Sequence, residues 1–466
     1  MRPFRPRQTF RLNRRRLFVS FALAAGLVAG CASYRPEPLP AAPSMARDVA
    51  QIEVDASRMP LPRLRSHRFD PSDGLDIDEV AMLAVANNPR LKVARDRLGI
   101  ARAQAFAAGL LPDPQLAAAS DHPTSGAGAT NAFSLGLSED LRALLTHPVA
   151  RRAAQAHTRQ VNLDLLWQEW QVVSRARLLF VRNLEQRRLL GVLEQNKALF
   201  AERAQRARTA LAEGNVTLEA VSADLVALQE AGRQIDELER RLERNRLDLD
   251  LLLGLEPGTK LDLVGDATLP PLDRAQIRAR LKDLARRRPD LLALRAGYQS
   301  QELRTREAVL AQFPALNVGL NRARDTSDVY TLGIGISLSL PIFDANRGNI
   351  AIQRATRRSL HDQYAQRLAT AKAEVQGILE SQRLLERQLQ GVQTSLTELG
   401  RTTASADEAY RAGNLSELAY ANLRAGLLAK RVEDITLRQR ILEQRVALAT
   451  LVGGDLPITA TKGTQG

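Results

Sequence analysis

Residues 332–340 read Leu-Gly-Ile-Gly-Ile-Ser-Leu-Ser-Leu, so that branched aliphatic side chains alternate with glycine and serine. In a β-strand this period of two places the aliphatic side chains on one face and the small ones on the other. A transmembrane strand needs about 9 to 11 residues, apolar toward lipid and often flanked by aromatic rings, and Tyr330 and Phe343 bracket this one. We predict a strand at 330–340 whose lipid-facing residues are Leu332, Ile334, Ile336, Leu338 and Leu340. A half-buried strand of a soluble sheet is the alternative.

Three further segments alternate in the same way. Residues 315–321 precede this strand across a polar loop, 322–328, and residues 115–120 and 132–138 carry weaker versions of the pattern. Four strands cannot close a barrel, and their open edges are not tolerated in lipid. Three chains would supply twelve strands, so closure of the barrel demands an oligomer.

The chain repeats itself at an offset of about 200 residues. Matching landmarks are 88–91 and 288–291, 213–216 and 412–415, and 252–254 and 451–453. A shared offset at three landmarks indicates duplication and quasi-symmetric architecture. We therefore divide the chain into a first repeat at 73–253, a linker at 254–272, a second repeat at 273–453 and a tail at 454–466.

Long helices dominate each predicted repeat. Aromatic residues make up 4% of the chain, and a composition rich in Ala, Leu, Arg, Glu and Gln is typical of long helices. We predict one hairpin from helices at 149–212 and 218–253, and another from helices at 349–411 and 415–452. Asp76 and Asp273 are predicted to cap shorter helices that break at Pro89 and Pro289, with Asp290 capping the resumed helix. The predicted fold class is mainly α, with duplicated long helical hairpins and a small membrane β part.

The N-terminus has the features of an export signal. Residues 1–30 contain seven arginines and no acidic residue. The arginines precede an apolar run at 17–28, which is too short for an ordinary membrane helix. Val28-Ala29-Gly30-Cys31 resembles a bacterial lipobox, and Cys31 is the only cysteine, so we predict diacylation there. Residue 32 is Ala and not the Asp that is associated with retention of lipoproteins in the inner membrane, so we predict transport to the outer membrane. The proline-rich residues after Cys31 are typical of an extended tether or a wrap along the body, which we bound at 31–72.

Several chemistries find no support in the sequence. The net charge of +14 falls to 14 − 7 = +7 without residues 1–30, and the remaining basic residues are scattered, which argues against nucleic acid as a partner. The five histidines show no spacing typical of a metal site, and there is no phosphate loop or catalytic triad. We expect no metal, no cofactor and no enzyme. Asp224, Asp407 and Glu408 could line a cation path or simply lie on a solvated helical face.

The mature chain resembles the TolC-like outer-membrane efflux channels over nearly its whole length. The resemblance rests on three segments: 88–91, 109–114 and, most specifically, Leu340-Pro341-Ile342-Phe343-Asp344-Ala345-Asn346-Arg347-Gly348-Asn349. The last is most similar to the cobalt-zinc-cadmium resistance branch, whereas Thr146-His147-Pro148 departs from that branch in the first repeat. The substrate is therefore left open between metal cations and organic compounds.

This resemblance implies a function and a set of partners. The protein would be a homotrimer, with a 12-stranded β-barrel in the outer membrane and an α-helical barrel in the periplasm. This lipid-anchored channel would passively conduct substrate that a proton-driven inner-membrane pump delivers through a periplasmic adaptor. The adaptor would dock on the hairpin tips at Gly214, Asn215, Val216, Gly413, Asn414 and Leu415. On the turn chemistry alone, these glycines could serve only to reverse the chain. The competing function is a periplasmic coiled-coil scaffold or adaptor lipoprotein without a pore.

Overall fold

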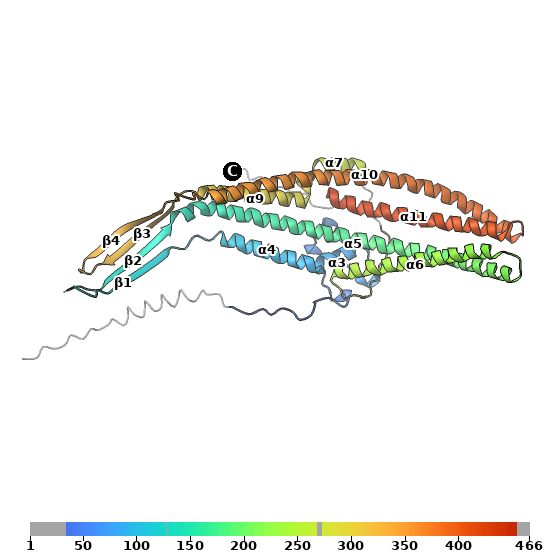
Figure 1. The fold of residues 1–466 in the computed structure, drawn as a ribbon, viewed down its shortest axis with the longest axis horizontal. Coiled ribbons are helices and arrows are strands. Elements are labelled where there is room, and N and C mark those ends of the chain that lie inside the picture. The colour runs from blue at the N-terminus through green and yellow to red at the C-terminus, as the bar shows by residue number, and fades with distance from the viewer. Residues whose placement is uncertain (1–33, 127, 268–272, 454–466) are drawn as a thin grey trace, which may run out of the picture. The chain divides into compact units, whose positions relative to one another are not determined.

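The computed structural model describes residues 34–126, 128–267 and 273–453. The chain divides into two units, at Met45 and Ala46, and the described residues of the first unit, 34–45, form no helix or strand. All elements below belong to the second unit (Figure 1). The predicted signal peptide, Cys31, part of the predicted linker and the predicted tail lie outside the described residues.

Residues 46–73 of the second unit pack against its helices through a series of short helical turns. These are η1 (Val49–Gln51), η2 (Ala56–Arg58), α2 (Pro62–Ser66) and η3 (Pro71–Asp73). Met59, Leu61 and Leu64 are buried in the main core, and Ala46 forms a parallel bridge with Leu255. This part of the predicted 31–72 segment is thus a wrap along the body and not a free tether.

The same order of elements then occurs twice, except that two short helices stand in the second half where the first has only one. The first half holds α3 (Ile77–Asn87), α4 (Pro89–Ala107), β1 (Gln115–Asp121), β2 (Ala132–Asp140), α5 (Leu141–Ala212) and α6 (Leu218–Leu253). The second half holds α7 (Arg274–Lys282), α8 (Leu284–Arg287), α9 (Pro289–Leu310), β3 (Ala315–Arg324), β4 (Tyr330–Ser339), α10 (Arg347–Arg411) and α11 (Glu417–Val452). In Figure 1 the strands lie at one end of α5 and α10, and the α5–α6 and α10–α11 turns lie at the other.

The predicted helix starts are partly confirmed. Asp76 caps α3 by accepting from the backbone N–H groups of Asp78 and Glu79, and Asp273 caps α7 by accepting from Ala275. The start of α5 was predicted wrongly, because we placed it after Pro148. Asp140 caps the helix instead, so α5 begins at Leu141 and carries Pro148 inside it. With 72 residues, α5 spans roughly 110 Å at the rise of an α-helix.

Asp290 does not cap α9 as predicted. The capping position is Arg288, which makes no capping hydrogen bond from its side chain. The Asp290 carboxylate instead binds the Arg288 guanidinium at 3.0 and 2.7 Å and Arg367 of α10 at 2.8 Å. Arg288 is fully buried, and its guanidinium carbon lies 4.9 Å from the centre of the Trp167 ring. Asp290 therefore connects α9 to α10 and α5 as the counter-ion of a buried arginine.

The four strands form one antiparallel sheet in the order β1-β2-β3-β4. Each strand lies where the alternation predicted it, but β2 and β3 extend further, to Asp140 and Arg324, which shortens the predicted 322–328 loop. The fourth strand ends at Ser339, so Leu340 lies just beyond it. The sheet therefore joins the two halves of the chain through the β2–β3 pair.

The 340–349 segment, which carries the most specific sequence signature, makes a sharp turn between β4 and α10. Ala345 and Asn346 both have positive φ, 43° and 55°, a conformation that asparagine tolerates better than most residues. The Asn346 side-chain amide donates to the Ala308 carbonyl of α9 at 2.8 Å. The signature thus fixes how the chain passes from the sheet into α10.

Candidate functional site: membrane sheet and hairpin tips

The register of the sheet gathers its aliphatic side chains on one face. Residues directly opposite each other in an antiparallel pair share a face. The aliphatic pairs between β3 and β4 are Leu316 with Leu338, Val318 with Ile336, and Leu320 with Ile334. Leu332, Ile334, Ile336 and Leu338 are between 50% and 78% exposed in the single chain. We call this the aliphatic face of the sheet; it continues onto β2 through Leu135 and Leu137.

The opposite face carries small or polar residues. Across β3 and β4 it pairs Asn317 with Ser337, Gly319 with Gly335, and Asn321 with Gly333. On β2 it continues through Ser134, Gly136 and Ser138. Lipid on one side and water on the other would suit these two faces, whereas a soluble sheet would bury its aliphatic face in its own chain.

Both outer strands keep an open edge in the single chain. β1 pairs with β2 only and β4 with β3 only, so one row of backbone N–H and C=O groups on each strand lacks a partner strand in the described chain. Exposed edges of this kind are costly in lipid and prone to pair with other strands. The four strands of one chain therefore form an open sheet with two unpaired edges.

Aromatic rings mark the end of the sheet at the loops. Phe133 and Tyr330 lie edge to face with ring centres 6.3 Å apart, and the Arg324 guanidinium lies 5.7 and 5.9 Å from those centres. Rings at this level are typical of the boundary between hydrocarbon and headgroups. At the other end of β4, Phe343 is 90% exposed, so both predicted bracketing rings are available to lipid.

The two hairpin tips have the same backbone structure. Gly214 and Gly413 both have φ of +76°, and each ends its long helix in a Schellman motif. Asn215 N–H donates to the Ala210 carbonyl at 2.8 Å, and Asn414 N–H donates to the Ala409 carbonyl at 2.9 Å. Both asparagines have ordinary negative φ, so glycine alone supplies the left-handed residue. A Cβ built on either glycine would meet no atom within 4 Å, which leaves bare backbone exposed at both tips.

An ion pair joins the two hairpins just behind the tips. Arg206 of α5 binds Glu417 of α11 and Glu202 of its own helix, both at 2.5 Å. Two of the acids that we weighed as cation-path residues are also paired. Asp224 binds Arg203 at 2.7 Å, and Asp407 binds Arg411 at 2.5 Å and accepts from the Tyr420 hydroxyl at 2.7 Å. That hydrogen bond raises the pKa of Tyr420. These contacts indicate that Asp224 and Asp407 hold neighbouring side chains in place and do not line a cation path.

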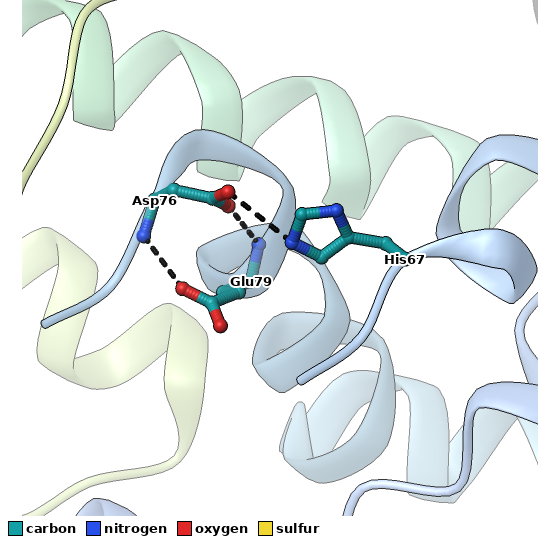
Figure 2. A group of neighbouring side chains, drawn as sticks. All are labelled: His67, Asp76 and Glu79. Atoms are coloured by element: carbon teal, nitrogen blue, oxygen red, sulfur yellow. Dashed lines mark hydrogen bonds and ion pairs between the residues drawn. The ribbon is translucent and has the colours of Figure 1, made fainter. Parts of the chain in front are cut away.

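One cluster in the described chain brings together groups of the kind that bind metals, and the sequence did not indicate it. His67, Asp76 and Glu79 place ligand-type atoms within 4.8 Å of one another (Figure 2). However, Glu79 accepts from the backbone N–H groups of Asp70 and Asp76, and Asp76 accepts from those of Asp78 and Glu79. His67 Nε2 lies 3.2 Å from the remaining Asp76 oxygen. Both carboxylates form the capping box of α3, so the cluster stabilises the start of this helix and is not assigned as a metal site.

No helix in the described ranges is both long enough and apolar enough to cross a membrane.

Comparison with known proteins gives consistent matches. Residues 281–454 match the family described as outer membrane efflux protein. The pyoverdine export outer membrane protein OpmQ of Pseudomonas aeruginosa is 27% identical, over 93% of this chain and 96% of its own. Two similar solved structures are the CmeC outer membrane channel of Campylobacter jejuni and the open state of the MtrE outer membrane channel of Neisseria gonorrhoeae. CmeC has a TM-score of 0.66 at 18% identity, covering 92% of this chain and 96% of its own. MtrE has a TM-score of 0.65 at 14% identity, covering 91% of this chain and 98% of its own.

These matches confirm the predicted resemblance to the TolC-like outer-membrane efflux channels. The proteins that the chain is similar to are outer-membrane export proteins and channels, not enzymes. The sheet of this chain belongs to the outer membrane and its helices to the periplasm.

Proposed function

We propose that three copies of the chain form one outer-membrane channel, with twelve strands in the membrane and a helical barrel below. The sheet register carries this proposal, because it gives an aliphatic face, a small polar face and two open edges in the same four strands. Pairing β1 of one copy with β4 of the next would satisfy both edges at once. The small polar residues would then line a water-filled lumen through which substrate passes without an energy source in this chain.

We propose further that the channel works in a tripartite system. An inner-membrane pump, driven by protons, would deliver substrate through a periplasmic adaptor that docks on Gly214, Asn215, Val216, Gly413, Asn414 and Leu415. Support comes from the exposed bare backbone at both tips, since small residues allow a partner helix to approach closely. The competing scaffold function would leave the aliphatic face without lipid and the sheet edges unpaired.

Two observations bear on the substrate class, and they point to different substrates. The 340–349 segment resembles the metal-exporting branch, whereas the relative OpmQ is named for pyoverdine export. The lumen residues of β3 and β4 are neutral and do not favour either class. We propose metal cations as the first candidate. Growth of a deletion strain on cobalt, zinc and cadmium salts tests this, and unchanged metal tolerance together with new sensitivity to organic compounds would overturn it.

We also propose that Cys31 is diacylated and anchors the mature chain. Its support is the Val28-Ala29-Gly30-Cys31 sequence. Mass spectrometry of the mature N-terminal peptide should give a Cys31 residue carrying acyl chains. A mature chain that begins elsewhere, or an unmodified Cys31, would overturn the assignment.

Arginine substitutions on the two faces of β4 test the channel proposal. Ile336→Arg places a charge on the aliphatic face near the middle of the strand, at a cost of about 2–4 kcal/mol per copy in lipid. We expect it to reduce the amount of folded protein in the outer membrane several-fold. Ser337→Arg is the matched control, because it adds the same side chain to the opposite face.

The control should keep normal membrane levels but lower the conductance of each channel. Quantitative immunoblots of membrane fractions and recordings in planar bilayers provide the two measurements. Equal tolerance of arginine at both positions would contradict the assignment of one face to lipid and the other to the lumen.

A further inference from the structure

Two arginines of β3, Arg322 and Arg324, lie on the aliphatic face of the sheet at its loop end. Arg322 of β3 lies opposite Leu135 of β2 and Leu332 of β4, and Leu320 precedes it on the same face. Its side chain is exposed, and it makes no hydrogen bond or ion pair with any residue that the structure describes. An arginine in this setting has either an energetic cost or a ligand outside the chain.

The position of Arg322 along the strand limits that cost. It lies two residues from the aromatic level at Arg324, which corresponds to about 7 Å along the strand. Arginine on the lipid face costs about 2–4 kcal/mol at the bilayer midplane but only about 0–1 kcal/mol near the interface. The long side chain can also extend toward the headgroups while its stem stays on apolar surface. The Arg322 guanidinium is therefore within reach of the headgroup region.

A second arginine is already fixed beside it. Arg324 donates to the Asn131 carbonyl from Nε at 3.2 Å and from a terminal nitrogen at 2.6 Å, and it lies against Phe133 and Tyr330. Its ion pair with the exposed Asp328 is longer, at 3.4 Å. The residues that flank Arg322 on this face are Leu135, Leu320, Arg324 and Leu332, so no carboxylate competes for it there.

The direction of this end of the sheet identifies the membrane leaflet. The loops joining β1 to β2 and β3 to β4 lie at this end, whereas the opposite strand ends continue toward α5, α9 and α10 (Figure 1). Because the helices are periplasmic, the arginines lie at the level of the outer leaflet. The anions at that level are the phosphate groups of lipids, and guanidinium groups bind phosphate with paired, charge-assisted hydrogen bonds.

We propose that Arg322 and Arg324 form a binding site for the phosphate group of an acylated lipid of the outer leaflet. The acyl chains would lie along Leu320, Leu332 and Ile334, directly below the two guanidinium groups. This inference rests on the sheet lying in the outer membrane and is independent of the pump, the adaptor and the exported substrate. It assigns a lipid ligand to each copy of the chain.

Binding of defined lipids to purified, delipidated protein tests the site. Native mass spectrometry would compare lipid A carrying its phosphates, lipid A treated with phosphatase, and inorganic phosphate. We expect the phosphorylated lipid to bind at least about tenfold more tightly than the phosphatase-treated lipid, and Arg322→Gln to remove that difference. Arg322→Lys should retain part of it, since lysine keeps the charge but lacks the planar fork.

The matched control is Arg354→Gln, which removes an exposed arginine from α10, away from the sheet. It should bind lipid like the wild type. Unchanged preference for phosphorylated lipid A in Arg322→Gln would overturn the site, and full competition by equimolar inorganic phosphate would overturn its lipid character. We expect Arg322→Gln to keep the oligomer size and conductance of the wild type, which distinguishes failure of the lipid site from failure of the channel proposal.

Discussion

Replacing Gly413 with tryptophan should abolish export while leaving assembled trimers in the outer membrane. The exposed backbone at Gly413 has no neighbouring atom within 4 Å of a Cβ, so a large ring there would occupy the space proposed for the adaptor. The φ of +76° adds a local cost of about 1–2 kcal/mol for a residue other than glycine. That cost is confined to an exposed turn far along the chain from the sheet. Substrate accumulation in cells and the amount of trimer in membrane fractions are the two measurements.

Three further variants separate bulk from backbone strain. Gly413→Asn keeps a residue that tolerates positive φ and should preserve export. Val216→Trp adds bulk at the other tip, at a residue that lacks positive φ, and should impair export. Gly391→Trp places the same ring on an exposed position of α10 away from the tip and should have little effect. Unchanged export in Gly413→Trp would contradict adaptor docking at this tip.

Replacing Asp290 with asparagine should destabilise the protein by about 3–5 kcal/mol, because it leaves a buried guanidinium without its counter-ion. Arg288 is fully buried, and Asp290 binds it through two hydrogen bonds while also binding Arg367. The asparagine side chain has nearly the same size as the aspartate but carries no charge. Thermal unfolding followed by circular dichroism in detergent measures the loss. Asp96→Asn, on an exposed position of α4, makes the same chemical change and should shift the unfolding by less than about 0.5 kcal/mol.

The same substitution should alter the response to acid. Burial raises the pKa of Asp290, but the hydrogen bonds and charges of Arg288 and Arg367 outweigh it and hold the pKa below its usual range. A carboxylate with a lowered folded-state pKa stabilises the fold above its unfolded-state pKa, and that stability is lost as the pH falls through the folded-state pKa. Asp290→Asn should therefore lose most stability near neutral pH and differ least from the wild type in strong acid. A pH-independent difference would contradict the ion-pair role.

The sequence predicted the sheet better than the contacts around the helices. Alternation over nine residues located β4 directly, and the 200-residue offset located the weakly patterned β1 and β2 in the first half. Both signals are local or periodic. The start of α5 was missed because Pro148 suggested a helix boundary, whereas the Asp140 cap determined it.

Contacts between distant segments account for the remaining differences. Asp290 directly follows Pro289, and an acid at the start of a helix suggests a capping residue. Its partner Arg367 lies 77 residues away, and no local pattern indicates that pairing. The hairpin tips were located because their Gly-Asn chemistry is local, whereas the docking role that we propose for them depends on a partner outside the chain.

Conductance of the purified wild-type protein in planar lipid bilayers tests the central claim most directly. If three copies close a barrel around a polar lumen, stepwise conductance increases should appear as trimers insert, and each step should fall in Ser337→Arg. Protein that stays monomeric and never conducts would contradict the channel and favour a periplasmic scaffold.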